Sequence, residues 1–235
     1  MPADTPLYFR LLSRLLRPFP DFDFGFIKPV RARAVDALHL RAGDRALDLG
    51  CGPGGSLPFL RAAVGPSGEA IGVEISARVA ALATRRIERH GWTNVRVVVA
   101  PAERAELAGV FDGALMFAAP DVYASDAAWA NLRPVLRPGA RVALFGAKTS
   151  RRRGGWVLNG LLRTMMPRLS FASTPVPTDA PWSAVATELR DIEVREYFFG
   201  WMFLATGTWV PEGPVDAASE SRRPEGDRTV STASE

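Results

Sequence analysis

The chain has 235 residues, 47% of them hydrophobic and 23% charged, which are the proportions of an ordinary globular domain and exclude fibrous, collagen-like and wholly disordered chains. Its one cysteine, Cys51, excludes an internal disulfide and a cysteine-based zinc cluster. The formal net charge is +4, and all but two of the 29 basic residues are Arg, a bias typical of a GC-rich bacterial coding sequence rather than of a nucleic-acid-binding surface.

The first segment, residues 1–29, is predicted to form an N-terminal helical cap. Three arginines recur in it at spacings of four and three and therefore share one face of a helix: Arg10, Arg14 and Arg17. Packing of the opposite, apolar face onto the rest of the chain is favoured over attachment to a membrane surface.

Between residues 45 and 147 short apolar runs alternate with longer helical patterns. Five runs have the length and composition of buried strands: residues 45–50, 69–76, 95–100, 111–117 and 141–147. Helices are predicted from about Ser56, through residues 77–90 and up to Leu136, with a turn at Pro138-Gly139 before the fifth strand. This alternation predicts a parallel sheet with helices on both faces.

The pattern changes after Gly146. Residues 150–182 are predicted to be an insert that covers the substrate, and Ser183–Leu189 is predicted to be a helix. Two strands are predicted around Gly200. Residues 30–210 would thus form the folded domain, and residues 211–235, rich in Pro, Gly, Ser and Glu, are predicted to be a disordered tail.

The sequence shows none of the signals that direct a chain to or across a membrane. The N-terminus lacks the basic segment, apolar run and cleavage site of a signal peptide. The longest strongly apolar stretch, residues 197–210, contains Gly200 and Gly207 and is shorter than the roughly 20 residues that a membrane-spanning helix needs. We therefore expect a cytoplasmic protein without integral membrane association.

A glycine-rich loop joins the first predicted strand to the helix after it, in the segment LDLGCGPGG at residues 47–55. Glycine lets the backbone approach a ligand closely, and the helix N-terminus behind the loop presents free N–H groups. The loop alone is compatible with either a nicotinamide dinucleotide or S-adenosylmethionine. Asp48 favours the second, because a carboxylate opposes a pyrophosphate but stabilises a ligand that carries an ammonium and a sulfonium.

At this point the chain resembles the class I S-adenosylmethionine-dependent methyltransferases, whose first motif is very similar to LDLGCGPGG. The resemblance extends from about Val30 to Gly207 and includes GVEIS, APAERAEL, FDGALMF and LRPGARVALF. It implies an α/β fold with a Rossmann-like, mostly parallel seven-stranded sheet of order 3-2-1-4-5-7-6, whose last strand is antiparallel, and helices on both faces.

The resemblance also implies a role for each matching residue. The methionine part of the cofactor would lie against the loop and the acid before it, at Asp48, Gly50, Cys51, Gly52 and Gly54. Glu74, at the end of the second strand, would accept hydrogen bonds from both ribose hydroxyls. Ile75 would pack on one adenine face, the backbone of Ala102 would contact the adenine edge, and Phe117 would close the site near the sulfonium.

One position departs from the family pattern. Many relatives carry an Asp where this chain has Pro101, and that Asp accepts a hydrogen bond from the adenine amino group. Glu103, two residues further on, is the candidate replacement.

The sequence offers no obvious general base. His39 and His90 lie at predicted helix ends, where a structural role is favoured. The polar residues nearest the expected site are Asp121 and Tyr123, which we take as the catalytic candidates. Methyl transfer is an in-line displacement, so proximity and desolvation in an aromatic pocket would supply much of the catalysis. Five residues of the cap and the insert are the candidates for binding the substrate: Tyr8, Phe24, Trp156, Asn159 and Arg163.

The function expected is methyl transfer from S-adenosylmethionine to a small molecule, without a metal ion or nucleic acid. Three alternatives stay open: cleavage of another carbon–sulfur bond of the sulfonium, giving aminocarboxypropyl transfer or cyclisation; methylation of a nucleic acid; and a binding module without turnover, which only Pro101 favours. A homodimer is also left open.

Overall fold

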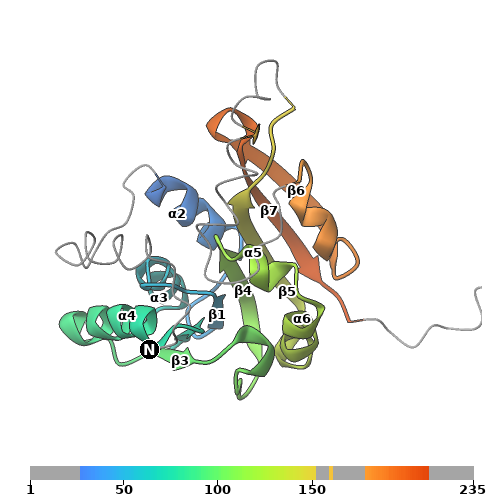
Figure 1. Cartoon of the computed structure of the whole chain (residues 1–235). Coiled ribbons are helices and arrows are strands. Elements are labelled where there is room, and N and C mark those ends of the chain that lie inside the picture. Colours follow the sequence, from blue (N-terminus) through green and yellow to red (C-terminus); the bar gives the residue numbers. More distant parts are fainter. Residues whose placement is uncertain (1–26, 152–158, 161–177, 212–235) are drawn as a thin grey trace, which may run out of the picture.

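A computed structural model describes residues 27–151, 159–160 and 178–211, and these residues contain a seven-stranded sheet of order β3-β2-β1-β4-β5-β7-β6 (Figure 1). The strands are β1 (Arg45–Leu49), β2 (Glu69–Glu74), β3 (Val95–Val99), β4 (Phe111–Phe117), β5 (Leu136–Ala147), β6 (Leu189–Tyr197) and β7 (Met202–Trp209). Neighbours from β3 to β5 pair in parallel, and β7 runs antiparallel to both β5 and β6. The predicted strand order and the predicted antiparallel last strand are confirmed.

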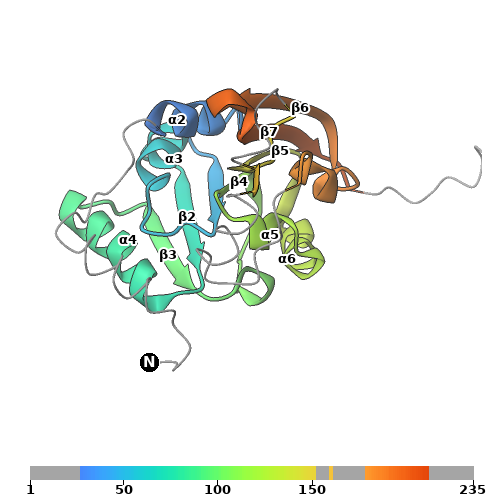
Figure 2. The same ribbon diagram turned by 45° about the horizontal axis from the view of Figure 1, so that its top comes forward.

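Helices cover both faces of the sheet, as the alternating pattern predicts (Figures 1 and 2). One face is covered by α2 (Lys28–Asp36), α3 (Leu57–Val64) and α4 (Ala77–His90), and the other by α5 (Pro120–Tyr123) and α6 (Asp126–Leu132). Each face has its own apolar core: Leu60 of α3 packs in one, and Trp129 of α6 packs in the other. The direction in which successive strands are added reverses between β1 and β4, at the centre of the sheet. Ligands of such folds bind at this switch point.

Local sequence explains where the helices begin and end. In α4, Ala80, Ala83 and Ile87 recur at helical spacing and are buried, and Gly91 ends the helix in the left-handed conformation with φ 61°. Ser125 caps α6, because its hydroxyl accepts a hydrogen bond of 3.2 Å from the backbone N–H of Ala128.

Three predicted boundaries are wrong. The helix predicted to end at Leu136 ends at Leu132, because strand β5 begins at Leu136, which pairs with Phe111. Pro138-Gly139 therefore lies in an irregularity inside the strand rather than before it. The predicted helix Ser183–Leu189 is instead a short 3₁₀ turn, η3 (Pro181–Val185), because Leu189 pairs with Trp209 as the first residue of β6. In each case strand pairing in the sheet overrides the local preference of the sequence.

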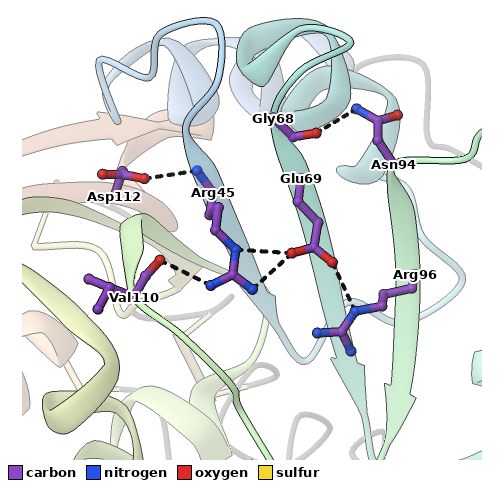
Figure 3. A network of polar contacts seen from close by, with 7 residues as sticks. All are labelled: Arg45, Gly68, Glu69, Asn94, Arg96, Val110 and Asp112. Carbon is purple, nitrogen blue, oxygen red and sulfur yellow. Dashed lines mark hydrogen bonds and ion pairs between the residues drawn. The ribbon is translucent and has the colours of Figure 1, made fainter.

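Polar contacts connect the strands at their amino ends, opposite to the glycine loop (Figure 3). Glu69, at the start of β2, accepts hydrogen bonds from Arg45 of β1 at 2.8 and 3.0 Å and from Arg96 of β3 at 3.0 Å. The backbone N–H of Arg45 also donates to Asp112 of β4 at 2.8 Å. Four neighbouring strands are thus held in register at their amino ends, which leaves the carboxyl ends for ligands.

Several predictions concern residues outside the described ranges. They are the cap at residues 1–29 except its last residues, most of the insert at residues 150–182, and the tail at residues 211–235 except its first residue, so the predicted domain boundaries stay predictions. Within the described ranges, no helix has both the length and the apolar character needed to cross a membrane.

Candidate cofactor site

The glycine loop leaves the carboxyl end of β1 with three glycines in the left-handed region, Gly50 at φ 73°, Gly52 at 55° and Gly54 at 81°. The backbone N–H of Gly50 donates to the carbonyl of Val73 at 2.8 Å, so the loop is anchored to β2. A Cβ at Gly50 would lie 2.7 Å from Cβ of Ala119, whereas a Cβ at Gly52 would meet nothing within 4 Å. Gly50 is therefore needed for packing against α5, and Gly52 faces open space where a ligand can approach.

Asp48 is fully buried directly before this loop, and neither of its carboxylate oxygens makes a hydrogen bond within the described part of the chain. Burial raises the pKa of Asp48 to about 7, although the nearby Arg31 guanidinium and Ser56 hydroxyl oppose this effect. A buried carboxylate whose neighbours, here Arg31 and Ser56, do not offset its burial costs free energy of folding. Such a group is typical of a site that awaits a cationic or hydrogen-bond-donating ligand.

Glu74 ends β2 with its carboxylate turned toward the glycine loop. Its Oε2 accepts a hydrogen bond from the backbone N–H of Gly52 at 3.0 Å, and its Oε1 accepts one from the N–H of Ser76 at 2.8 Å. Burial raises the pKa of Glu74, and these two hydrogen bonds oppose it. Each oxygen keeps a second lone pair, so the carboxylate can still accept hydrogen bonds from a vicinal diol.

Four carboxyl groups influence one another at this end of the sheet. Burial is the largest cause of the raised pKa of Asp48, Glu74 and Asp121, and a neighbouring carboxylate adds to the rise in each case. This neighbour is Glu74 for Asp48, Asp121 for Glu74, and Glu103 for Asp121. Asp121 therefore lies among the acids of the cofactor side. The negative charge of the cluster favours a cationic ligand such as a sulfonium and opposes a pyrophosphate.

The residues predicted to surround adenine lie together beyond β2 and β3. Ile75 follows Glu74 and is 56% exposed, an unusual position for a large apolar side chain. Ala102 begins the 3₁₀ turn η1 (Ala102–Arg104), and its carbonyl accepts a hydrogen bond of 2.8 Å from the Asn131 side chain. Glu103 is exposed on the same turn. The structure thus provides an apolar surface and a fixed backbone edge at this place.

Three other predicted residues have contacts that restrict their roles. The Cys51 thiol is buried and turned toward Gly72, so Cys51 offers only its backbone to a ligand on the loop. Tyr123 is buried, and burial followed by the charge of Asp121 raises the pKa of its hydroxyl, which therefore does not act as a base at neutral pH. Phe117 stacks on Phe145 with ring centroids 4.3 Å apart.

Asn159 is bound to neighbouring backbone rather than exposed to solvent. Its amide oxygen accepts hydrogen bonds from the N–H of Ser150 at 2.9 Å and from the indole of Trp201 at 3.1 Å, and its amide nitrogen donates to the Ser150 carbonyl at 2.8 Å. A role in orienting the substrate stays a prediction, and it would use the second N–H of the amide, since both lone pairs of the amide oxygen are already engaged. The other four predicted substrate residues lie outside the described ranges: Tyr8, Phe24, Trp156 and Arg163.

Sequence reasoning missed two arginines that contact the glycine loop. The guanidinium of Arg31, from α2, fills the space where a Cβ at Gly55 would be, and Arg86, from α4, donates to the Gly54 carbonyl at 2.9 Å. In a chain with so many arginines, composition cannot single out these two. The two histidines lie away from the loop, since His39 is in the turn after α2 and the His90 ring bonds the Arg86 carbonyl at the end of α4.

This geometry defines a class of protein: a Rossmann-like fold whose glycine loop, unpartnered buried carboxylate and strand-end glutamate suit a cationic adenosine derivative. The comparisons agree with it. Residues 46–139 match the family model of a methyltransferase domain. The chain is 35% identical over 193 residues to the nocamycin O-methyltransferase of Saccharothrix syringae, an alignment that covers 73% of this chain and 67% of that protein.

Two further comparisons show how far the similarity extends. An uncharacterized 37.1 kDa protein in transposon TN4556 of Streptomyces fradiae is 32% identical over 194 residues, which are 71% of this chain. The chain spans only 52% of the length of that relative. A crystal structure of a SAM-dependent methyltransferase from Aquifex aeolicus has the same fold, with a TM-score of 0.56, 18% identity, and coverage of 80% of this chain and 100% of that one. The chain belongs to the class I S-adenosylmethionine-dependent methyltransferases, and its cofactor is S-adenosylmethionine.

Proposed function

We propose that this protein transfers the methyl group of S-adenosylmethionine to an oxygen atom of a small molecule. The observation that carries the cofactor half of the proposal is Asp48, a fully buried carboxylate without a described hydrogen-bond partner beside three left-handed glycines. The choice of oxygen is supported by the relative from Saccharothrix syringae, which is named as an O-methyltransferase.

Each part of the proposed cofactor site has a chemical task. Glu74 would accept hydrogen bonds from the ribose hydroxyls, and Ile75 would pack on the adenine. Asp48 would stabilise the cationic methionine end, and the Arg31 guanidinium, which lies against the same loop, would bind its carboxylate. When bound, the cofactor supplies an electrophilic methyl group on a positively charged sulfur.

The chain itself would contribute position and desolvation to the reaction. Phe117 is buried at the end of β4, so it would exclude water from one side of the methyl group. Holding a nucleophile in line with the methyl carbon can lower the barrier by several kcal/mol. Tyr123 would donate a hydrogen bond rather than remove a proton, because the pKa of its hydroxyl is raised. Asp121 remains the candidate base among the residues predicted to be catalytic.

The acceptor side of the proposal includes the aromatic pocket expected from the sequence. Tyr8, Phe24, Trp156 and Arg163 remain the proposed substrate contacts of the cap and the insert. We also propose that the protein works in the cytoplasm without nucleic acid, and that a homodimer is the assembly to look for.

Product analysis tests this function. The purified protein is incubated with S-adenosylmethionine labelled in its methyl group and a panel of small molecules with hydroxyl or carboxyl groups. We expect S-adenosylhomocysteine in equal amount to a labelled methyl ether or ester. Release of methylthioadenosine would mean that another carbon–sulfur bond is broken, and labelled RNA or DNA with binding that falls steeply with salt would mean a nucleic-acid substrate.

A further inference from the structure

Lys148 directly follows β5, at the end of the sheet where the parallel strands have their carboxyl ends. Its side-chain ammonium is buried. Its side chain is only 4% exposed, and it forms an ion pair with Glu196 of β6, whose side chain is 42% exposed. The ammonium also lies 5.6 Å from the ring centroid of Trp182. An ammonium has three N–H donors, and within the described residues Glu196 is its one hydrogen-bond acceptor. Asp179 is a second carboxylate in the neighbourhood: Arg151 lowers its pKa most, and the charge of Lys148 adds to this effect. The described residues provide no hydrogen-bond acceptor for the two other donors of the ammonium, so a ligand can engage them.

Lys148 is connected to the cofactor loop through direct contacts. It lies two residues after Gly146 and therefore on the same face of β5. A Cβ at Gly146 would lie 2.7 Å from the Tyr123 hydroxyl, and Tyr123 belongs to α5, whose N-terminal neighbour Ala119 packs against Gly50. With the cofactor proposed on the loop between β1 and α3, the carboxyl end of β5 borders the same crevice in which ligands of such folds bind.

Aromatic rings join Tyr123 to Lys148 across the same face. The Phe203 ring of β7 lies 6.1 Å from the Tyr123 ring and 5.2 Å from the Trp182 ring, measured between centroids. Trp182 is only partly buried, so it can offer an apolar surface beside the ammonium. The cluster thus combines one hydroxyl, one cation and an indole at the place where an acceptor is needed.

The choice of lysine is itself informative in this chain. Only two of the 29 basic residues are Lys, and other ion pairs of the sheet use Arg, including Arg45 with Glu69 and Arg137 with Asp112. If Glu196 needed only a cation for strand pairing, an arginine would match its carboxylate with two hydrogen bonds. A compact ammonium with rotatable donors can bind an anion in addition to Glu196.

We propose that Lys148 binds an ionised oxygen of the methyl acceptor, a carboxylate carried on an apolar group that packs against Trp182. This inference rests on the proposed O-methyl transfer and names its substrate class. An oxygen lone pair forms the bond to the methyl carbon, the carbon–sulfur bond breaks with its electron pair going to sulfur, and no proton moves. A carboxylate is ionised at neutral pH, so its methylation needs no general base; Asp121 would be needed as a base only for a hydroxyl acceptor.

Paired probes of equal shape and different charge test this proposal. Calorimetry measures binding of 2-naphthoate and of neutral 2-naphthamide to the whole protein saturated with S-adenosylhomocysteine. We expect wild type to bind the carboxylate at least tenfold more tightly than the amide, and Lys148→Met to remove this preference. Glu196→Gln should retain or increase the preference, because it leaves the ammonium in place and removes the competing carboxylate.

The two variants separate acceptor binding from a structural role. A purely structural ion pair predicts that Lys148→Met and Glu196→Gln lower the melting temperature and the naphthoate affinity alike, and that result would overturn the proposal. Equal binding of both probes by wild type, or binding of neither, would also overturn it. Both variants should bind S-adenosylhomocysteine like wild type, whereas failure of wild type to bind it would contradict the proposed function instead.

Discussion

The guanidinium of Arg31 lies over the ring of Phe117, with its central carbon 4.4 Å from the ring centroid. Arg31 comes from α2, before the sheet begins, and Phe117 ends β4, so this cation–π contact joins the first described helix to the centre of the site. The same guanidinium occupies the space beside Gly55 and acts on the pKa of Asp48. Helix α2 therefore places a positive charge at the glycine loop, next to an otherwise acidic cluster.

Arg31→Met should weaken S-adenosylhomocysteine binding by about tenfold or more, on the order of 1.5–3 kcal/mol for a hydrogen bond to a charged group. It should leave binding of methylthioadenosine nearly unchanged, because that ligand lacks the amino-acid portion. Calorimetry with both ligands checks this. Arg33→Met, at an exposed position of the same helix, is the matched control and should bind both ligands like wild type. Equal weakening of both ligands by Arg31→Met would place the guanidinium away from the ligand carboxylate.

Glu74→Ala should weaken S-adenosylmethionine binding by about 1.5–3 kcal/mol, since it removes the acceptor for the ribose hydroxyls. It should also lower the free energy of unfolding, because the N–H groups of Gly52 and Ser76 lose their partner. Glu88→Ala, on the exposed side of α4, serves as control. Unchanged affinity in a folded Glu74 variant, measured by calorimetry, would remove this carboxylate from the site.

Alanine at two loop glycines should have different consequences. Gly50→Ala should destabilise the protein strongly, because its Cβ would meet Ala119 at 2.7 Å and its backbone is left-handed. Gly52→Ala should cost only about 1 kcal/mol of stability for the left-handed backbone, since nothing lies within 4 Å of its Cβ, yet it should block the cofactor. Chemical unfolding and calorimetry measure the two effects. The interpretation fails if Gly52→Ala binds the cofactor normally.

Asp48→Asn should stabilise the ligand-free protein in a pH-dependent way. Burial raises the pKa of Asp48 from 3.8 to about 7, so the folded chain holds this proton to higher pH than the unfolded chain does. Stability of wild type therefore falls as the pH rises from about 4 to about 7, and the cost is complete above about pH 7. We expect the variant to gain about 1–3 kcal/mol over wild type at about pH 8 and close to nothing at about pH 4.

Urea unfolding at the two pH values measures this difference, and calorimetry should show weaker S-adenosylmethionine binding by the same variant. A gain of the same size at both pH values would show that the Asp48 carboxyl group does not titrate in this range. A gain in stability together with a loss of affinity would identify Asp48 as a group kept for its ligand rather than for folding.

The fold and the cofactor could be predicted from the sequence because both depend on local patterns, and the residues named for the cofactor site stay predictions. Short apolar runs and the helical spacing of apolar residues predict the strands and helices, and the succession of strands with intervening helices predicts a parallel sheet. The glycines of the loop and Glu74 adjoin predicted strand ends, so their meeting follows from the topology. The boundaries of β5 and β6 were mispredicted because pairing with Phe111 and Trp209 decided them.

The contacts of Arg31, Arg86 and Lys148 were decided only by the tertiary structure. Each lies on an element that is distant in sequence from its partner, as with Lys148 and Glu196, which are 48 residues apart. Periodicity reports which face of an element is buried, but it does not report which charge lies across from it. The sequence by itself therefore determined the fold class and the cofactor. The charges beside the glycine loop, and the ion pair between Lys148 and Glu196, depend on the packing of α2, α4 and β6, because an electrostatic partner is defined by distance in space and not by spacing along the chain.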